Sequence, residues 1–125
     1  MNYVGGKYKL LPQIMPLIPN KLNTVVDLFC GGLDFSININ AGKIICNDII
    51  TPMIDMYRMF KNTSTEKIIE HIQNDIEKYG LNKTNQDGYL KLRSKYNNDK
   101  NPIDLMTLIA YCYNNQIRFN SHWGF

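Results

Sequence analysis

Two short apolar runs on either side of a glycine pair constrain the fold of this 125-residue chain most strongly. Thr24–Phe29 and Lys43–Asn47 are rich in β-branched residues and too short for helices, so each is expected to be a buried parallel strand. Gly31 and Gly32 follow the first run, and strand, glycine turn, helix, strand is the opening unit of a nucleotide-binding α/β sheet. An amphipathic helix over Lys7–Ile18 is expected before it. We therefore predict a partial Rossmann-like sheet.

The chain after about residue 58 has the pattern of helices and contains no run that suggests a strand. Thr51 and the proline after it are expected to begin a helix that continues towards Lys61. Thr63–Glu66 fits a capping box at the start of the next helix. Further helices are expected around Tyr89–Tyr96 and from Pro102 to Tyr113. We predict an α/β part over residues 1–57 and a small helical part over residues 58–125.

Composition narrows the class of protein only partly. The net charge of +3 permits nucleic-acid binding without requiring it. No apolar run approaches the roughly 20 residues of a membrane helix and no signal peptide is evident, so a cytoplasmic location is expected. The cysteines form no CxxC pair, and His71 and His122 complete no metal-ligand spacing, so no metal site is predicted. Cys30 and Cys46 lie in apolar segments and are expected to be buried free thiols.

An acidic residue after the second run, Asp48, adds to the evidence for a ligand site. It lies about 20 residues after the glycine turn, where a carboxylate can accept hydrogen bonds from ribose hydroxyls. Each feature also has a plain explanation, because a glycine pair often forms a simple turn and Asp48 could stabilise a helix N-terminus. Because the glycine pair and Asp48 follow consecutive predicted strands, a ligand site and the plain explanations are about equally favoured. The sequence contains no G-x-G-x-x-G motif, which argues against NAD.

Several segments together resemble, in order and spacing, the D12 class of DNA adenine-N6 methyltransferases, and phage-type members most closely. The resemblance covers almost the whole chain and rests on Tyr3–Lys7, Asp27–Gly32, Cys46–Tyr57, Tyr89–Tyr96, Asn101–Leu105 and Asn115–Phe125. The last of these looks like the R-[YFI]-N-x-x-G-x-F segment of the class. The resemblance implies site-specific methyl transfer from S-adenosylmethionine to adenine N6 in double-stranded DNA, with a helical target-recognition part.

The resemblance also implies a cofactor site, residue by residue. Tyr3 would pack on S-adenosylmethionine, Lys7 would contact its carboxylate end, and Asp48 would bind the ribose hydroxyls. The strand end and turn would line the pocket through Asp27, Phe29, Cys30, Gly31 and Gly32. Most of the class has glycine where this chain has Leu33, and this departure bears on how tightly the cofactor binds.

A polar segment around Arg118 is the predicted DNA-reading element. Arginine can bond O6 and N7 of guanine, asparagine or glutamine can bond adenine, and Tyr113 could stack where the target base leaves the duplex. Composition alone favours a polar helix end with a core Tyr113, whereas the resemblance favours a loop that reads a short site such as GATC. The residues implied to bind DNA are Tyr113, Asn114, Gln116, Arg118 and Asn120.

The catalytic loop of the class, [DN]-P-P-[YFW], has no counterpart in this sequence, since Asn101-Pro102 does not match it. No catalytic residue is assigned, and the chain is expected to be a truncated portion that is inactive alone. A second polypeptide or self-association is expected to complete the sheet. Two alternatives stay open: a non-catalytic remnant or subunit that binds DNA or S-adenosylmethionine, and an unrelated α/β nucleotide-binding domain.

Overall fold

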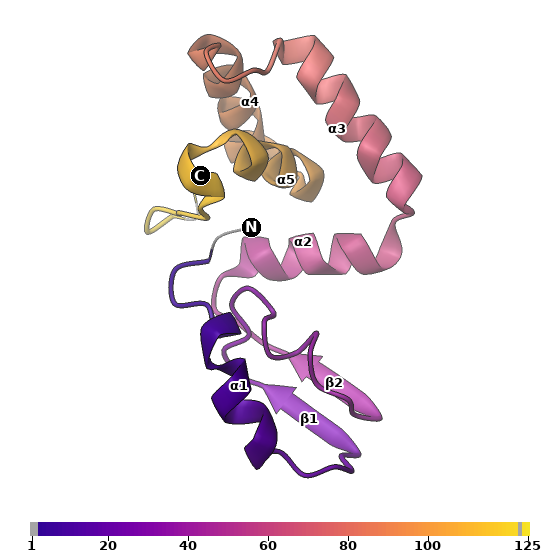
Figure 1. The fold of residues 1–125 in the computed structure, drawn as a ribbon. Helices are drawn as coiled ribbons and strands as arrows, with labels where there is room; N and C mark the ends of the chain where they lie inside the picture. The colour runs from indigo at the N-terminus through magenta and orange to yellow at the C-terminus, as the bar shows by residue number, and fades with distance from the viewer. Residues whose placement is uncertain (1–2, 123) are drawn as a thin grey trace. The chain divides into compact units, whose positions relative to one another are not determined.

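The two predicted strands lie side by side in the computed structural model, which describes residues 3–122 and 124–125 (Figure 1). β1 spans Thr24–Asp27, β2 spans Lys43–Cys46, and the two strands pair in parallel. This pairing confirms the α/β prediction. The expected burial is wrong, because the two-stranded sheet leaves most of its side chains exposed: Asp27 is buried, whereas Val26 and Cys46 are exposed. Cys30, just after β1, is buried as predicted.

The helical stretch before β1 is shorter and less regular than predicted. The α-helical part, α1, spans only Leu11–Ile14, and 3-10 turns lie on either side of it at Tyr8–Leu10 and Met15–Leu17. Pro12 lies in the first turn of α1, where a missing N–H costs nothing. Pro16 then removes a donor from the following turn, so the α-helix cannot continue.

The segment from Gly31 to Gly42 is described throughout, and it joins the strands without the predicted helix. Leu33 has φ +64°, a left-handed conformation that does not propagate a helix. The hydrogen bond from the N–H of Ile37 to the carbonyl of Leu33, at 3.0 Å, closes a single turn. A ligand at the glycine turn would therefore meet loop N–H groups there, without the added dipole of a helix N-terminus.

Helices form the second part of the chain, as the sequence predicts. The last of these helices, α5 (Pro102–Tyr111), packs against each of the three others (Figure 1). The helices span Thr51–Asn62 (α2), Thr65–Tyr79 (α3), Gln86–Asp99 (α4) and Pro102–Tyr111 (α5). The hydrophobic side chains of this part with almost no exposure come from α2, α4 and α5, and they are Met53, Met56, Leu92, Tyr96, Leu105 and Leu108.

The predicted capping box is not formed. α3 begins one residue later than expected, with Ser64 as its N-cap and no side-chain cap bond. The N–H of Thr63 instead donates to the carbonyl of Met59 at 2.9 Å, so Thr63 belongs to the end of α2. At α4, by contrast, the side chain of Asn85 accepts from the N–H of Gly88 at 3.0 Å and caps the helix.

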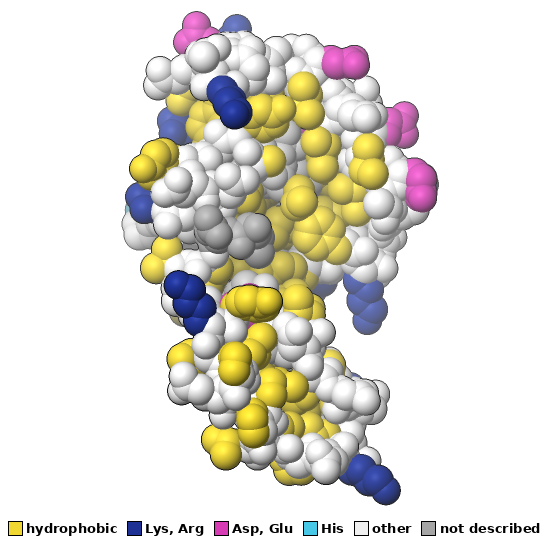
Figure 2. Space-filling model, viewed as in Figure 1, with side chains coloured by type: hydrophobic (Ala, Val, Ile, Leu, Met, Phe, Trp, Pro, Cys, Tyr) yellow, Lys and Arg dark blue, Asp and Glu magenta, His cyan; other side chains and the backbone are white. Residues whose placement is uncertain are grey.

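Contacts divide the described residues into two compact units, residues 3–49 and residues 50–122 with 124–125. α2 therefore belongs to the second unit, while the functional division at residue 57 stays a prediction. Apolar side chains reach the surface of the first unit (Figure 2). Those more than half exposed are Val4, Tyr8, Leu17, Val26, Leu28, Phe29, Ile37 and Ile49. Within the described residues, no helix combines the length and apolar character that crossing a membrane requires.

Candidate cofactor site and nucleic-acid interface

Residues that follow β2 hold the glycine turn at the end of β1. The N–H of Cys30 donates to the carbonyl of Asn47 at 2.9 Å, and the N–H of Gly31 donates to the carboxylate of Asp48 at 2.9 Å. The side-chain amide of Asn47 donates to the carbonyl of Leu28 at 3.0 Å. These bonds tie the carboxyl ends of the two parallel strands together and bring Asp48 to the turn.

The N-terminal segment lies on the same turn. The ring of Tyr3 covers Gly31 so closely that a Cβ on Gly31 would lie 2.7 Å from Cε1 of the ring. Nζ of Lys7 donates to the carbonyl of Phe29. Three segments that lie far apart in the sequence therefore meet at one turn within one unit. They contribute Tyr3 and Lys7, Gly31, and Asp48.

Asp27 is the buried acid of this region. Oγ of Ser36 donates to Oδ2 of Asp27 at 2.7 Å, and the main-chain carbonyl of Asp27 accepts from the N–H of Asn47 at 2.8 Å. Phe29 differs sharply, since its side chain is 75% exposed. In this structure Asp27 braces the loop between the strands, while Phe29 offers an aromatic face to solvent.

The glycine turn carries charged side chains of both signs, while its thiol and phenol are neutral. Burial, followed by the neighbouring groups Cys46 and Asp48, raises the pKa of Cys30 to about 11. Burial, followed by the charge of Asp48, also raises the pKa of Tyr3. The thiol and the phenol are therefore neutral near neutral pH. The charged side chains at the turn include Asp48 and Lys7, which attract groups of opposite sign to their own.

Gly31→Ala is expected to displace the Tyr3 ring and lower the free energy of unfolding of the first unit by about 1–3 kcal/mol. Gly31 has φ +46°, so alanine there carries backbone strain in addition to the clash. Gly5→Ala is the matched control, because Gly5 has φ +85° but nothing lies within 4 Å of its Cβ position. Denaturant unfolding and NMR of the Tyr3 ring measure both effects. Equal stability losses and an unmoved ring in both variants would contradict the contact.

The predicted DNA-reading segment follows α5 as an exposed loop. Asn114 and Asn115 have φ +55° and +52°, left-handed values that asparagine tolerates, and they turn the chain. Tyr113 is 82% exposed, so it is not a core aromatic. Nη2 of Arg118 donates to Oε1 of Gln116 at 2.6 Å, and both side chains line a cavity of about 220 Å³. The loop thus presents an aromatic ring, an amide and a guanidinium together.

Inward-facing neighbours hold Arg118 in place. Ile117, just before it, is buried. Phe119, just after it, packs edge-to-face on Phe125 with ring centroids 5.6 Å apart. The main-chain N–H of Phe125 donates to Oδ1 of Asn97 on α4 at 2.9 Å, which anchors the end of the loop. Arg118 itself is exposed between these anchors.

Asn120 has a clear structural role in this loop. Its Oδ1 accepts from the N–H of His122 at 2.9 Å and from the N–H of Gly124 at 2.8 Å. Gly124 lies one position further along than the glycine of the resembled pattern. The Asn120 side chain closes this longer turn, and contact of Asn120 with DNA stays a prediction.

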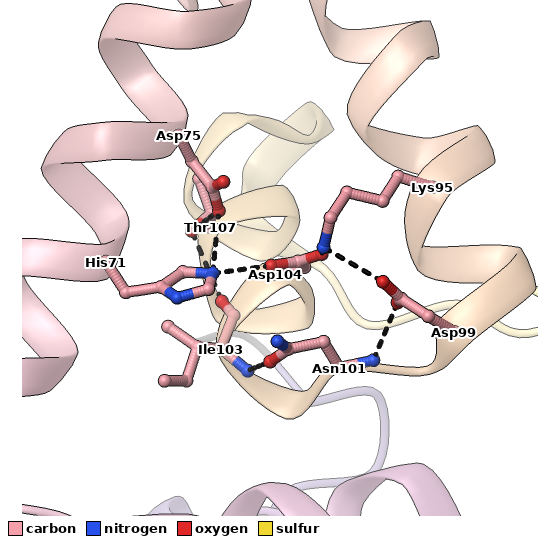
Figure 3. A network of polar contacts seen from close by, with 8 residues as sticks. All are labelled: His71, Asp75, Lys95, Asp99, Asn101, Ile103, Asp104 and Thr107. Carbon is pink, nitrogen blue, oxygen red and sulfur yellow. Dashed lines mark hydrogen bonds and ion pairs between the residues drawn. The ribbon is translucent and has the colours of Figure 1, made fainter.

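A charged network in the helical unit was not predicted from the sequence (Figure 3). Nε2 of His71 on α3 lies 2.7 Å from Oδ1 of Asp104 on α5 and 3.6 Å from Oδ2 of Asp75. Nζ of Lys95 on α4 binds the other oxygen of Asp104 and lies 3.0 Å from Asp99. Asp104 is fully buried and Asp75 nearly so. The network therefore joins three helices around two buried carboxyl groups.

The His71, Asp75 and Asp104 atoms lie within 4.8 Å of one another, a spacing that a metal ion could bridge. The ammonium of Lys95 already neutralises Asp104, however, and its charge opposes a cation at the same carboxylate. Burial opposes the charge of Lys95, but its bonds to Asp104 and Asp99 outweigh this and raise its pKa. The arrangement thus fits a structural role better than a metal centre. The His71–Asp75 spacing of i, i+4 was the one sequence signal for it.

Comparison with known proteins links both regions to DNA modification. The family model of the D12 class N6 adenine-specific DNA methyltransferases matches residues 3–125. The type II methyltransferase M.FokI of Planomicrobium okeanokoites is 52% identical over 122 residues, which are 98% of this chain and 19% of that protein. The modification methylase StsI of Streptococcus sanguinis is 46% identical over 125 residues, which are 100% of this chain and 19% of that protein.

A more distant relative is named for the methylation of adenine in DNA. The DNA adenine methylase of Haemophilus influenzae (strain ATCC 51907 / DSM 11121 / KW20 / Rd) is 24% identical over 125 residues, 97% of this chain and 43% of that protein. The chain thus spans about a fifth of the length of M.FokI and StsI and under half of this methylase.

Proposed function

Because the chain belongs to the D12 class of N6 adenine-specific DNA methyltransferases, we propose that it binds S-adenosylmethionine and double-stranded DNA for methyl transfer to adenine N6. In this proposal residues 1–57 form a Rossmann-like cofactor part, and residues 58–125 form the helical target-recognition part. The names of M.FokI and StsI further suggest a role in restriction–modification. The residues assigned here bind the cofactor and read DNA, and none is assigned to act on the target amino group.

The glycine turn suits the chemistry of this cofactor. S-adenosylmethionine supplies an activated methyl group on a sulfonium cation, and it also carries ribose hydroxyls and a carboxylate. Asp48 would accept hydrogen bonds from the ribose, and its charge favours the sulfonium. Lys7 would pair with the carboxylate. The absence of a Cβ at Gly31, where Tyr3 now lies within contact distance, lets a flat group approach the backbone.

One observation carries the proposal. Asp48 accepts a hydrogen bond from Gly31 while Tyr3 covers that same glycine, so three residues of the resembled cofactor site meet at one turn. A plain turn after a strand requires neither an acid from the next strand nor an aromatic from the N-terminus. Their meeting therefore favours the ligand site over the plain alternatives that the sequence left open.

The proposed activity is tested by identifying the methylated base. The protein that carries this chain is incubated with duplex DNA and S-adenosylmethionine labelled in its methyl group. The DNA is then digested to nucleosides and analysed by mass spectrometry. We expect the label on the exocyclic nitrogen of adenine. Label on cytosine, or DNA without label, would contradict the proposal.

Arg118→Ala is expected to weaken binding to the preferred DNA site by about 1–3 kcal/mol, because a bidentate arginine–guanine contact is lost. The preferred site is first selected from random duplexes, and its affinity is compared with that of a scrambled duplex. Arg58→Ala is the matched control, since Arg58 is an exposed arginine of the same unit that pairs with Asp55 on its own helix. An equal loss on both duplexes would reduce Arg118 to a phosphate contact.

A further inference from the structure

A groove in the helical unit extends beyond the predicted DNA-reading loop. One cavity, of about 330 Å³, is lined by Tyr89, Tyr111 and residues 82–86. The cavity of about 220 Å³ that contains Gln116 and Arg118 is also lined by Tyr89. Tyr89 therefore borders both cavities, and the two cavities with this shared tyrosine are called the groove below.

The chemistry of the first cavity is that of a phosphate-binding surface. Its lining contains the cation of Lys83, the amides of Asn82, Asn85 and Gln86, and the hydroxyls of Thr84 and two tyrosines, but no aspartate or glutamate. Lysine, glutamine and tyrosine side chains are usual partners of DNA phosphate oxygens. The amides of Asn82 and Asn85 and the hydroxyl of Thr84 already donate within the loop. The second cavity adds Arg118 and likewise has no acidic lining. The groove as a whole is complementary to a polyanion.

Loop 82–86 is held rigidly by its own asparagines. Oδ1 of Asn82 accepts from the N–H of Thr84 at 2.9 Å and from the N–H of Asn85 at 2.8 Å. Nδ2 of Asn85 donates to the carbonyl of Gly80 at 2.9 Å. Lys83 is exposed, and no ion pair involves it among the residues that the structure describes. Its charge is therefore available on a preformed loop.

We propose that loop 82–86 binds the phosphate backbone of the DNA whose bases meet the Tyr113–Arg118 loop, with Tyr89 at the junction. This inference rests on the proposed function, because it extends the DNA surface by a second contact. Lys83 and Gln86 face phosphate oxygens, and they position the duplex without reading its sequence. The consequence is a contribution to affinity that depends on salt and is equal for all sequences.

Gln86→Glu tests the groove with a variant that should stay folded. Gln86 is the first residue of α4, where a carboxylate is favourable to the helix dipole. Its new charge would repel a nearby phosphate and weaken duplex binding about fivefold at low salt, with a smaller effect at high salt. Gln73→Glu is the matched control, since Gln73 is exposed on α3 and lines neither cavity. It makes the same change in net charge, and its affinity should stay within about twofold of wild type.

Lys83→Gln provides an independent measurement. The slope of log affinity against log salt should fall by about 0.9, the value for one lost phosphate contact. Lys67→Gln, on the exposed side of α3, should leave the slope unchanged. The loss of affinity caused by Lys83→Gln, and that caused by Gln86→Glu, should each be equal for the preferred and the scrambled duplex. Fluorescence anisotropy of labelled duplexes with the full chain gives these values.

The outcomes separate this inference from the function on which it rests. In one outcome, Arg118→Ala weakens binding to the preferred duplex, while Gln86→Glu binds like Gln73→Glu and Lys83→Gln keeps the wild-type slope. The proposed phosphate contact of loop 82–86 is then overturned, and the proposed function stands. If Lys83→Gln weakens only the preferred duplex, the loop reads bases and the backbone assignment is wrong. If the wild-type chain binds no duplex, both fail together.

Discussion

Asp104→Asn is expected to lower the free energy of unfolding of the helical unit by about 2–4 kcal/mol, because it breaks a buried ion pair. Asp104 is fully buried, and its two oxygens bind Lys95 and His71. An asparagine would remove the negative charge beside Lys95, whose other carboxylate partner, Asp99, is exposed. Urea unfolding followed by circular dichroism measures the loss.

Asp75→Asn, the same substitution at the neighbouring acid, is not expected to lower the free energy of unfolding. Burial, followed by the charge of Asp104, raises the pKa of Asp75, so its ionised form destabilises the folded state. Asp75→Asn keeps an acceptor for the hydroxyl of Thr107 but removes the charge. We expect it to be neutral or stabilising near neutral pH. Asp55→Asn, at an exposed pair with Arg58, is the control and should cost less than about 1 kcal/mol.

The sign of the pH dependence follows from the raised pKa of Asp75. The folded state holds this proton more tightly than the unfolded state, so its contribution is full below the ordinary aspartate pKa and is lost as pH rises through the raised value. Asp75→Asn should lack this contribution. His71, Lys95 and Asp104 also face this carboxylate, so the comparison between variant and wild type, rather than either curve alone, isolates Asp75. Equal losses for the Asp75 and Asp104 variants would contradict their different roles.

Asp48→Asn is expected to weaken S-adenosylmethionine binding about 10- to 100-fold, because hydrogen bonds to a charged group contribute about 1.5–3 kcal/mol. Asparagine keeps an acceptor for the N–H of Gly31, so the turn should stay intact while the charge at the ribose is lost. Asp55→Asn makes the same chemical change in the helical unit and should bind the cofactor like wild type. Isothermal calorimetry gives all three affinities. If Asp48→Asn binds as tightly as wild type, Asp48 does not hold the ribose.

The sheet and the helices were predictable from the sequence because their signals are local. The β-branched runs around Val25 and Ile44 predicted the strands, and the parallel pairing followed from the glycine turn between them. The helix expected after that turn does not form, since Leu33 adopts a left-handed conformation that no local pattern reveals. Cys46 was expected to be buried because its segment is apolar, but the two-stranded sheet leaves it exposed.

The residues around the turn were predicted through the family resemblance, and their geometry came from the structure. No pattern in the sequence reveals that Tyr3 covers Gly31, since the contact joins the N-terminal segment to the turn that follows β1. The helical network was missed for the same reason, because His71 and Asp104 are 33 positions apart. The helix α3 is rich in isoleucine, yet its buried residue is Asp75, and Ile69 is 49% exposed.

Calorimetric titration of S-adenosylmethionine into the full chain tests the central claim most directly. That claim is that the turn joining Tyr3, Gly31 and Asp48 is a cofactor site. We expect a saturable heat with one ligand bound per chain, weakened by Asp48→Asn and unchanged by Asp55→Asn. No heat at millimolar ligand, or equal heats in all three proteins, would contradict the assignment.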